Sequence, residues 1–325
     1  MMKKNNYGIL TNSHNRGMLI RRKSDVLLVF AVLIAMFAFA SFSSEVFLKP
    51  RNLKGLFGAN IGLLILSYAQ IFIIALGGVD LSVGSVISVV NVTIITILGK
   101  NPDAWPLAFA VALAIGAGVG LINGLLVVKG NMQPIIATLA TQTSFAGVAL
   151  LIMDIPGGTM PSYLSKLIAK GWDYIFPAIY VIIITAVVWI IFNRTRFGRS
   201  ILAIGGNEQA AECTGIRVAR TKILAFMSSG ILSAIAAICI TAYTTSGNPL
   251  VGEPFTQRSL TTAVVGGALM AGGKVSVIGC IAATFIMGLI NNMLNLLNIS
   301  AYYQYVLQGV ILVGALAISA LRSKK

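Results

Sequence analysis

The sequence predicts an all-α fold, a polytopic transmembrane helical bundle of eight to ten helices, with ten preferred. Two observations lead to this class. Of the 325 residues, 57% are hydrophobic and only 10% are charged, whereas soluble globular domains carry about 25% charged residues. Apolar runs also recur from residue 26 to residue 321. One transmembrane domain is therefore expected over residues 25–321, between short cytoplasmic tails at 1–24 and 322–325.

Ten apolar segments follow one another along the chain, most of them near the length of about 17 to 25 residues that a span needs. The first, Val26 to Ala40, follows a basic stretch as a secretory signal would. A polar tail precedes it and further spans follow, so an uncleaved anchor is favoured. The third and eighth segments are short and interrupted by glycine. The segments are 26–44, 56–76, 83–98, 107–128, 135–153, 175–192, 223–243, 259–270, 276–298 and 301–321.

The orientation follows from the distribution of lysine and arginine between alternate loops. With ten spans and a cytoplasmic N-terminus, 17 basic residues fall inside and 7 outside. The positive-inside rule favours this arrangement. Both termini and the 193–222 loop are therefore predicted to be cytoplasmic.

Two similar glycine-broken stretches occupy similar places in the two halves of the chain. Ile74 to Gly78 leads to Ser85, and Ala263 to Gly267 leads to Ser276. Paired breaks of this kind indicate an internal repeat with a pathway at its interface. Chance is the alternative in a chain with 33 glycines.

The first break carries an acidic residue, Asp80, between two apolar segments. Its carboxylate either caps the following helix at Ser82 or Val83 or lines a wet pathway, and the two roles are compatible. Glycines around it permit close backbone approach. The residues assigned to the pathway and the helix breaks are Gly77, Gly78, Asp80, Ser82, Gly84, Gly266 and Gly267.

The 193–222 loop holds six basic residues and two acids. Within it, Asn207 can cap a helix of two turns with Glu208 in its first turn, and Gly215 can end that helix. Such a helix outside the membrane has the form of a docking element, while a solvated loop kept only for topology is the alternative. The docking residues are predicted to be Gly206, Asn207, Glu208, Ala210, Ala211, Gly215 and Ile216.

Uncharged amides dominate the polar residues inside the spans. Amides bind hydroxylated solutes without demanding a charge, although most such residues join helices to one another. The candidate solute contacts are Asn60, Gln70, Asn123, Gln142 and Asn291.

No catalytic, metal or cofactor site is expected. The stretch from Gly266 to Val275 fails as a phosphate-binding loop, because Ala268 and Val275 stand where glycine and serine or threonine are needed. The three cysteines are widely spaced, and His14 has no ligand neighbours. The net charge of +15 gathers at the ends of apolar runs, which is a membrane pattern rather than a nucleic-acid one.

Three motifs give the chain a family resemblance from about residue 50 to 320. They are Gly77-Gly78-Val79-Asp80-Leu81-Ser82-Val83-Gly84, the run from Gly206 to Ile216, and a C-terminal set of Pro249, Gly252, Val265-Gly266-Gly267, Gly272-Gly273 and Asn291-Asn292. They resemble the signatures of ribose-type, or monosaccharide, permeases of bacterial ABC importers. Two positions depart from the pattern. Thr256 to Leu260 lacks the acidic residue usual in pentose permeases, and Val275 replaces a glycine.

The resemblance implies a multi-pass protein of the bacterial cytoplasmic membrane that conducts a small polar solute, such as ribose or a related sugar, without catalysing a reaction. It implies as partners a cytoplasmic ABC ATPase dimer, a second permease subunit in a homo- or heterodimer, and an extracytoplasmic solute-binding protein. The alternatives are a secondary transporter or facilitator that works without an ATPase, and an intramembrane enzyme, for which no catalytic constellation is found.

Overall fold

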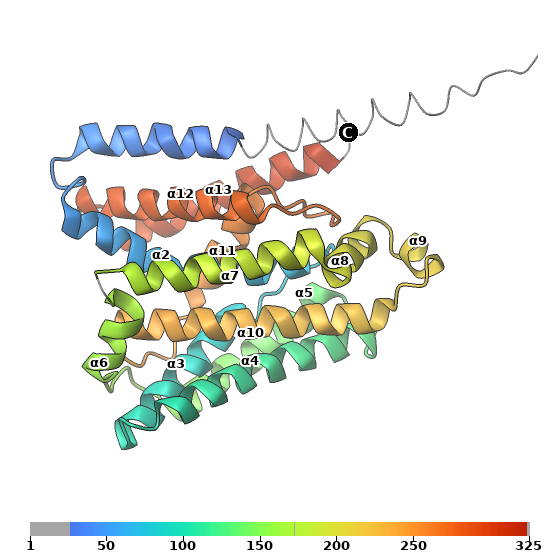
Figure 1. Cartoon of the computed structure of the whole chain (residues 1–325), viewed down its shortest axis with the longest axis horizontal. Helices are drawn as coiled ribbons and strands as arrows, with labels where there is room; N and C mark the ends of the chain where they lie inside the picture. The colour runs from blue at the N-terminus through green and yellow to red at the C-terminus, as the bar shows by residue number, and fades with distance from the viewer. Residues whose placement is uncertain (1–26, 172, 324–325) are drawn as a thin grey trace, which may run out of the picture.

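The computed structural model describes residues 27–171 and 173–323, and in these ranges the chain is helical apart from loops and a single antiparallel bridge between Gly157 and Gly247. The predicted tail at 1–24 and the last two residues lie outside the described ranges. Figure 1 shows most helices lying roughly parallel in one bundle. After a first helix, Leu27–Ser43, the elements are α2 Pro50–Ile74, α3 Val83–Lys100, α4 Trp105–Val128, α5 Pro134–Ile152, α6 Ser162–Ser165, the π-helix η1 Lys166–Lys170, α7 Ile175–Arg194, α8 Arg196–Gly206, α9 Glu208–Cys213, α10 Val218–Thr244, α11 Glu253–Val265, α12 Val277–Leu296 and α13 Ala301–Ser323.

Among the described residues, seven helices are long and apolar enough to cross a membrane: α2, α3, α4, α5, α7, α10 and α12. The apolar parts of the first helix and of α13 are shorter. The eighth predicted segment is α11, whose 13 residues rise only about 20 Å against a hydrocarbon core of about 30 Å. The all-helical, multi-pass class is therefore confirmed, while the count of ten spans is not.

Each of the ten predicted segments overlaps a helix, but several helices begin earlier than their apolar runs. Helix α2 starts at Pro50 and α11 has Pro254 in its first turn, because proline fits the first positions of a helix. Helix α11 accordingly covers 253–265, whereas the apolar run predicted 259–270. Helix α10 begins at Val218 in a basic, polar turn that hydropathy does not register.

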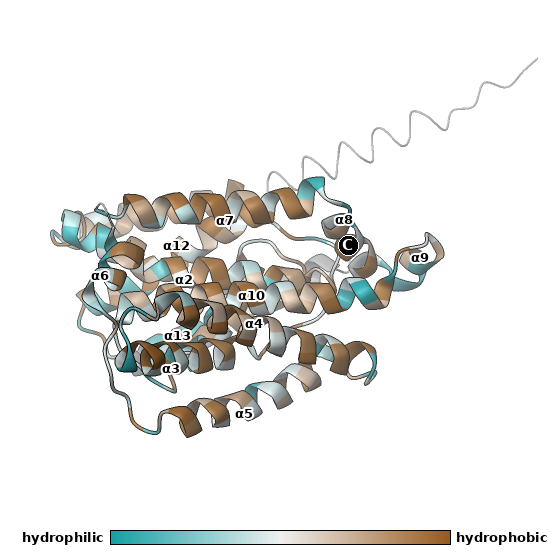
Figure 2. Ribbon diagram, turned by 60° about the horizontal axis from the view of Figure 1, so that its bottom comes forward, coloured by the Kyte–Doolittle hydropathy of each residue, from teal (hydrophilic) through white to brown (hydrophobic). Residues whose placement is uncertain are grey.

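Helices α2, α3 and α10 form the centre of the bundle. In α2, 89% of the most apolar window is buried, against 22% in α5 and in α7. The outer helices are mostly apolar where they are exposed: in Figure 2 the ribbon of α7 is largely brown, and that of α5 is brown with a paler stretch along its length. A helix that is apolar all round and exposed is suited to lipid.

Helix α10 crosses α4 at very short range because glycines face each other there. A Cβ added to Gly116 would lie 2.3 Å from the carbonyl oxygen of Gly230, and one added to Gly120 would lie 2.4 Å from that of Phe226. Small residues four apart let membrane helices approach closely. This crossing fixes α4 beside the centre of the bundle.

The bundle has two distinct ends. Helices α8 and α9 lie at one end, and α13 finishes on that side, while α6 lies at the other end (Figure 1). Helix α2 begins at the α6 end and runs toward the α8 and α9 end.

Candidate functional site

The first predicted break ends α2 with a Schellman motif. The N–H of Gly78 donates to the carbonyl of Ile73, the N–H of Gly77 donates to that of Ile74, and Gly77 has a φ of 80°. Glycine suits this position because a side chain is strained at positive φ. The chain therefore leaves the helix at Gly77 and crosses the interior as an irregular segment before α3.

Asp80 lies in this segment and is only 2% exposed. Its Oδ1 accepts hydrogen bonds from the N–H of Ser82 at 2.9 Å and from the Ser82 hydroxyl at 2.6 Å, and its Oδ2 accepts one from Ser229 of α10 at 3.0 Å. The carboxylate thus bonds the start of α3, as the sequence predicts, and also ties it to α10. Ser82 and Ser229 are neutral, so these contacts to the buried acid are hydrogen bonds and not ion pairs.

The polar contacts continue from Ser82 into α4 and α5. Asn123 donates to the Ser82 hydroxyl at 2.8 Å and accepts from Thr141 at 2.7 Å. The hydroxyl of Thr138 accepts from the N–H of Leu81 at 3.1 Å. We call these side chains, with Asp80, Gln70 and Ser229, the break network, which joins α2, α4, α5 and α10 around the irregular segment.

Gln70 supplies the α2 side of the break network. Its Nε2 donates to the carbonyl of Asp80 at 2.8 Å and, at 3.4 Å, lies near the hydroxyl of Ser259 on α11. Its Oε1 is buried with no hydrogen-bond partner among the described residues. Gln70 and Asn123 are therefore engaged in bonds between helices rather than lining an open cavity.

The second predicted break ends α11 in the same way as the first ends α2. The N–H of Ala268 donates to the carbonyl of Ala263, that of Gly267 donates to Val264, and Gly267 has a φ of 100°. Gly266 packs against Gly279 of α12, where an added Cβ at Gly279 would lie 1.8 Å from the Gly266 oxygen. The two stretches that look alike in sequence thus share a helix ending.

Gly84 serves close packing rather than a turn. It lies in the first turn of α3, where an added Cβ would be 2.2 Å from the Thr256 hydroxyl and 2.7 Å from the Gly252 oxygen. The N–H of Gly252 also donates to Ser88 at 3.1 Å. Helix α3 therefore rests on the start of α11.

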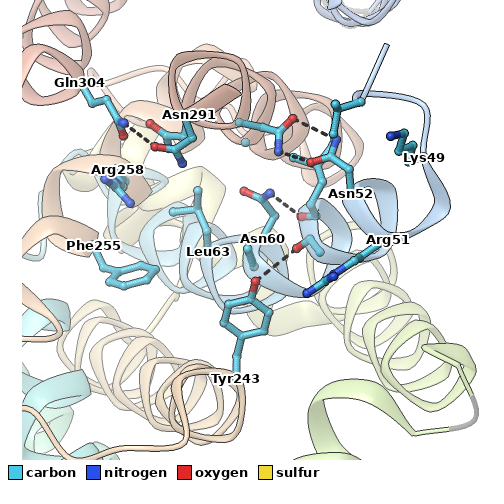
Figure 3. A pocket seen from close by; sticks show the side chains of 17 residues that line it. Lys49, Arg51, Asn52, Asn60, Leu63, Tyr243, Phe255, Arg258, Asn291 and Gln304 are labelled. Atoms are coloured by element: carbon cyan, nitrogen blue, oxygen red, sulfur yellow. Dashed lines mark hydrogen bonds between the residues drawn. The ribbon is translucent and has the colours of Figure 1, made fainter. Parts of the chain in front are cut away.

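A cavity of about 700 Å³ lies at the α6 end of α2, between the start of α2, α11, α12 and the start of α13 (Figure 3). Asn60 and Asn291, two of the predicted solute contacts, line it, whereas Gln70, Asn123 and Gln142 do not. Six amide side chains are among the lining residues: Asn52, Asn60, Asn291, Asn292, Asn295 and Gln304.

Hydrogen bonds between side chains hold several of these amides in place. Asn52 and Asn292 exchange two bonds, at 2.9 and 3.2 Å, and Gln304 donates to Asn295 at 2.7 Å. Tyr243 and Phe255 add aromatic surface to the wall. A cavity with many fixed amides and an aromatic wall is suited to a hydroxylated solute.

The predicted short helix in the 193–222 loop is α9. The side chain of Asn207 accepts from the N–H of Ala210 at 2.9 Å, and Glu208 lies in the first turn. After the helix, the N–H of Ile216 donates to Ala211 and that of Gly215 donates to Glu212, with a φ of 83° at Gly215. Glu208 also forms a salt bridge with Lys222 at 2.7 Å, which ties α9 to α10 near its start.

Three pairs of glycines meet where α8 ends, and we call them the glycine junction: Gly77–Gly78, Gly205–Gly206 and Gly272–Gly273. A Cβ added to Gly205 would lie 1.8 Å from the oxygen of Ala75, which accepts a hydrogen bond from the N–H of Gly273 at 2.9 Å. One added to Gly272 would lie 2.6 Å from the Gly205 oxygen and 2.9 Å from the Gly77 nitrogen. The helix before α9 is thus in backbone contact with the segments that follow both breaks.

Comparisons with known proteins identify the class of this chain. A family profile described as the permease component of a branched-chain amino acid transport system matches residues 53–316. The chain belongs to this permease family. The ribose import permease of Bacillus subtilis is 34% identical over 85% of this chain and 87% of the relative. The L-arabinose transport system permease of Escherichia coli is 36% identical over 92% and 90%, and the D-allose transport system permease of the same species is 30% identical over 93% of each. No solved structure gives a significant match.

The permease is therefore a multi-pass, non-catalytic subunit of an ABC importer in the cytoplasmic membrane. Importers of this family depend on a separate ATPase and a solute-binding protein. This agrees with the failed phosphate-loop pattern at 266–275, because ATP hydrolysis belongs to another subunit.

Sequence reasoning missed two parts of the permease's candidate site. Arg258 lines the cavity. The sequence placed it in a polar loop, because α11 begins at Glu253, before the apolar run that predicted the helix. The role of Gly205 was missed because its partners Ala75 and Gly273 lie more than sixty residues away. The recurring glycine pairs were a signal of close backbone contact, although they did not indicate which pairs meet.

Proposed function

We propose that this permease conducts a small polar solute, a monosaccharide such as ribose or a related sugar, along a path that starts at the polar cavity. The relatives named for ribose, arabinose and allose support the solute class. The fixed amides of the cavity support it independently, since they pair well with hydroxyl groups. Asn60 and Asn291 are the proposed solute contacts, while Asp80 acts through the packing of the break network.

We further propose that α9 docks a dimeric ATPase, and that two permease subunits form the membrane part of the importer. The glycine junction is the observation that carries this proposal. It puts the element before α9 in backbone contact with both broken segments, so a displacement of α9 by the ATPase would move the ends of α2 and α11 together. Interiors packed this closely shift as units rather than deform.

The orientation belongs to the same proposal: ten crossings, one of them made by the short α11 together with the chain on either side of it, with both termini, α8 and α9 in the cytoplasm. The 17 to 7 division of basic residues supports it. Labelling of an Arg199→Cys variant by an impermeant reagent from outside intact cells would overturn this topology.

The function is tested by uptake into liposomes that contain the permease with its ATPase and solute-binding protein. Uptake of the labelled sugar that this solute-binding protein delivers should require ATP inside and should stop when the ATPase is omitted. Uptake without the ATPase would instead support the alternative of a secondary transporter. Gly215→Val should uncouple uptake from hydrolysis, because a β-branched residue is strained at the φ of 83°. Gly215→Asn is the matched control, since asparagine tolerates the left-handed region.

A further inference from the structure

The polar cavity carries a strong positive charge. Lys49, Arg51 and Arg258 are among its lining residues, and none of the described residues that line it is aspartate or glutamate. A concave site lined by charges of one sign concentrates ligands of the opposite sign. The cavity is therefore built for more than a neutral solute.

These cations lie where the membrane topology disfavours them. In the proposed orientation, seven of the chain's lysines and arginines face outward, and three of the seven line this one cavity. The positive-inside rule is a bias that enriches lysine and arginine on the cytoplasmic side, so three outward cations at one cavity run against it. A shared function in the cavity accounts for their gathering.

Arg258 is the least exposed of these three basic residues. It is half-buried on α11, while Lys49 and Arg51 are exposed near the start of α2. Its Nε donates to Gln308 at 3.1 Å, and Gln308 donates in turn to Asn291 at 3.0 Å. The arginine is thus held at the wall beside a proposed solute contact, as Figure 3 shows for Arg258 and Asn291. A planar guanidinium matches a carboxylate in size and hydrogen-bond geometry.

We propose that the solute of this permease is an acidic sugar, in which a carboxylate accompanies the hydroxyl groups. Arg258 binds the carboxylate, the amides bind the hydroxyls, and Lys49 and Arg51 attract the anion at the mouth of the cavity. The inference rests on the proposed conduction of solute through this cavity and narrows its substrate class.

The charge of the cavity can be measured without knowing the solute. Ala59 is small, exposed and part of the lining, so Ala59→Cys is a reporter in a Cys213→Ser background, in which Cys239 and Cys280 are buried. The permease and its ATPase are placed in nanodiscs of zwitterionic lipid, so that no lipid anion competes. The reporter is then labelled with a sulfonate-bearing and with a trimethylammonium-bearing methanethiosulfonate.

Arg258→Gln should lower the ratio of the anionic to the cationic labelling rate by about fourfold or more, as expected for one charge at about 10 Å in water. Arg258→Lys keeps the charge and should keep the ratio. The exposed Thr159→Cys, outside the cavity, should show no change with either variant. An unchanged ratio at the cavity reporter would overturn the proposal.

Binding of an acidic sugar is tested by its ability to protect the same cysteine reporter from labelling. D-galacturonate should slow labelling by the uncharged reagent methyl methanethiosulfonate, D-galactose at equal ionic strength should not, and Arg258→Gln should remove the protection. Equal protection by both sugars, or protection by neither, would refute the acidic-sugar assignment. If ATP-driven uptake of a neutral sugar persists in that case, the proposed importer function stands and only its narrowing fails.

Discussion

Replacement of Gly205 by alanine tests whether the glycine junction connects the docking helix to the membrane segments. The added methyl carbon would lie 1.8 Å from the Ala75 oxygen and 2.6 Å from the Gly273 nitrogen. Since non-bonded contacts to carbon settle near 3.5 Å, α8 and the end of α2 must separate by roughly 1.7 Å. That shift strains or breaks the 2.9 Å hydrogen bond between Gly273 and Ala75.

The substitution should raise the free energy of the arrangement with the closed junction by about 2 kcal/mol. This is typical for overpacking a tight contact or disrupting one buried hydrogen bond. If the junction switches between two arrangements, about 2 kcal/mol changes their ratio by roughly thirtyfold. Uptake should therefore fall more than tenfold, while the variant still reaches the membrane and still binds the ATPase. Gly206 is the matched control: it belongs to the junction and to the predicted docking residues through its backbone, which alanine keeps, and an added Cβ there has nothing within 4 Å.

The assay compares ATP hydrolysis and solute uptake in the same liposomes. Gly205→Ala should hydrolyse ATP with little uptake, whereas Gly206→Ala should keep the normal ratio of uptake to hydrolysis. Normal coupling in a folded Gly205→Ala protein would refute the reasoning, because the junction would then tolerate separation. Equal losses in both variants would also refute it, since they would indicate a general effect on α8.

Three further predictions concern stability and packing. Gly116→Val should lower the melting temperature of the purified permease, at a cost of about 2 kcal/mol, because its added carbon meets the Gly230 oxygen at 2.3 Å, and Gly118→Val on the same helix, with open space, should not. Asp80→Asn should lower the free energy of unfolding by about 1 to 3 kcal/mol, because it disturbs the hydrogen bonds from Ser82 and Ser229. The control Asp103→Asn, at an exposed position, should leave stability unchanged, and equal melting curves for the two variants would contradict the break network. Glu208→Gln should change stability by less than about 1 kcal/mol, since its salt bridge with Lys222 is partly exposed, so a large loss of stability would show that α9 is more than a surface element.

The membrane-spanning helices could be predicted from the sequence, because a bilayer dictates the length and the apolar character of each span. It was less informative where a helix starts in polar residues, as at Pro50 and Val218, or where a short segment such as Ser162 to Lys170 packs at the end of the bundle. Those boundaries depend on capping and tertiary contacts, which hydropathy does not measure.

In the candidate site, too, some features could be predicted from the sequence and others could not. Local chemistry predicted the glycine turn at Gly77, the cap at Asn207 and the end of α9 at Gly215, since each needs only neighbouring residues. The partner of Asp80 on α10 could not be predicted, because Ser229 lies 149 residues away and meets it only through the packing of α10. The same holds for Arg258 and Gln308, which are 50 residues apart.

Helix α2 connects the three parts of the site. Asn60 lines the cavity, Gln70 joins the break network, and Ala75 accepts the bond at the glycine junction. Fifteen residues separate Asn60 from Ala75, which is about 22 Å along a helix. Because α2 is a continuous helix that is buried on nearly all sides, a displacement at Ala75 cannot be absorbed locally by solvent or by a loop. If α9 docks the ATPase as proposed, the rigid helix that the bundle needs as its core lets an event at that end change the shape of the polar cavity.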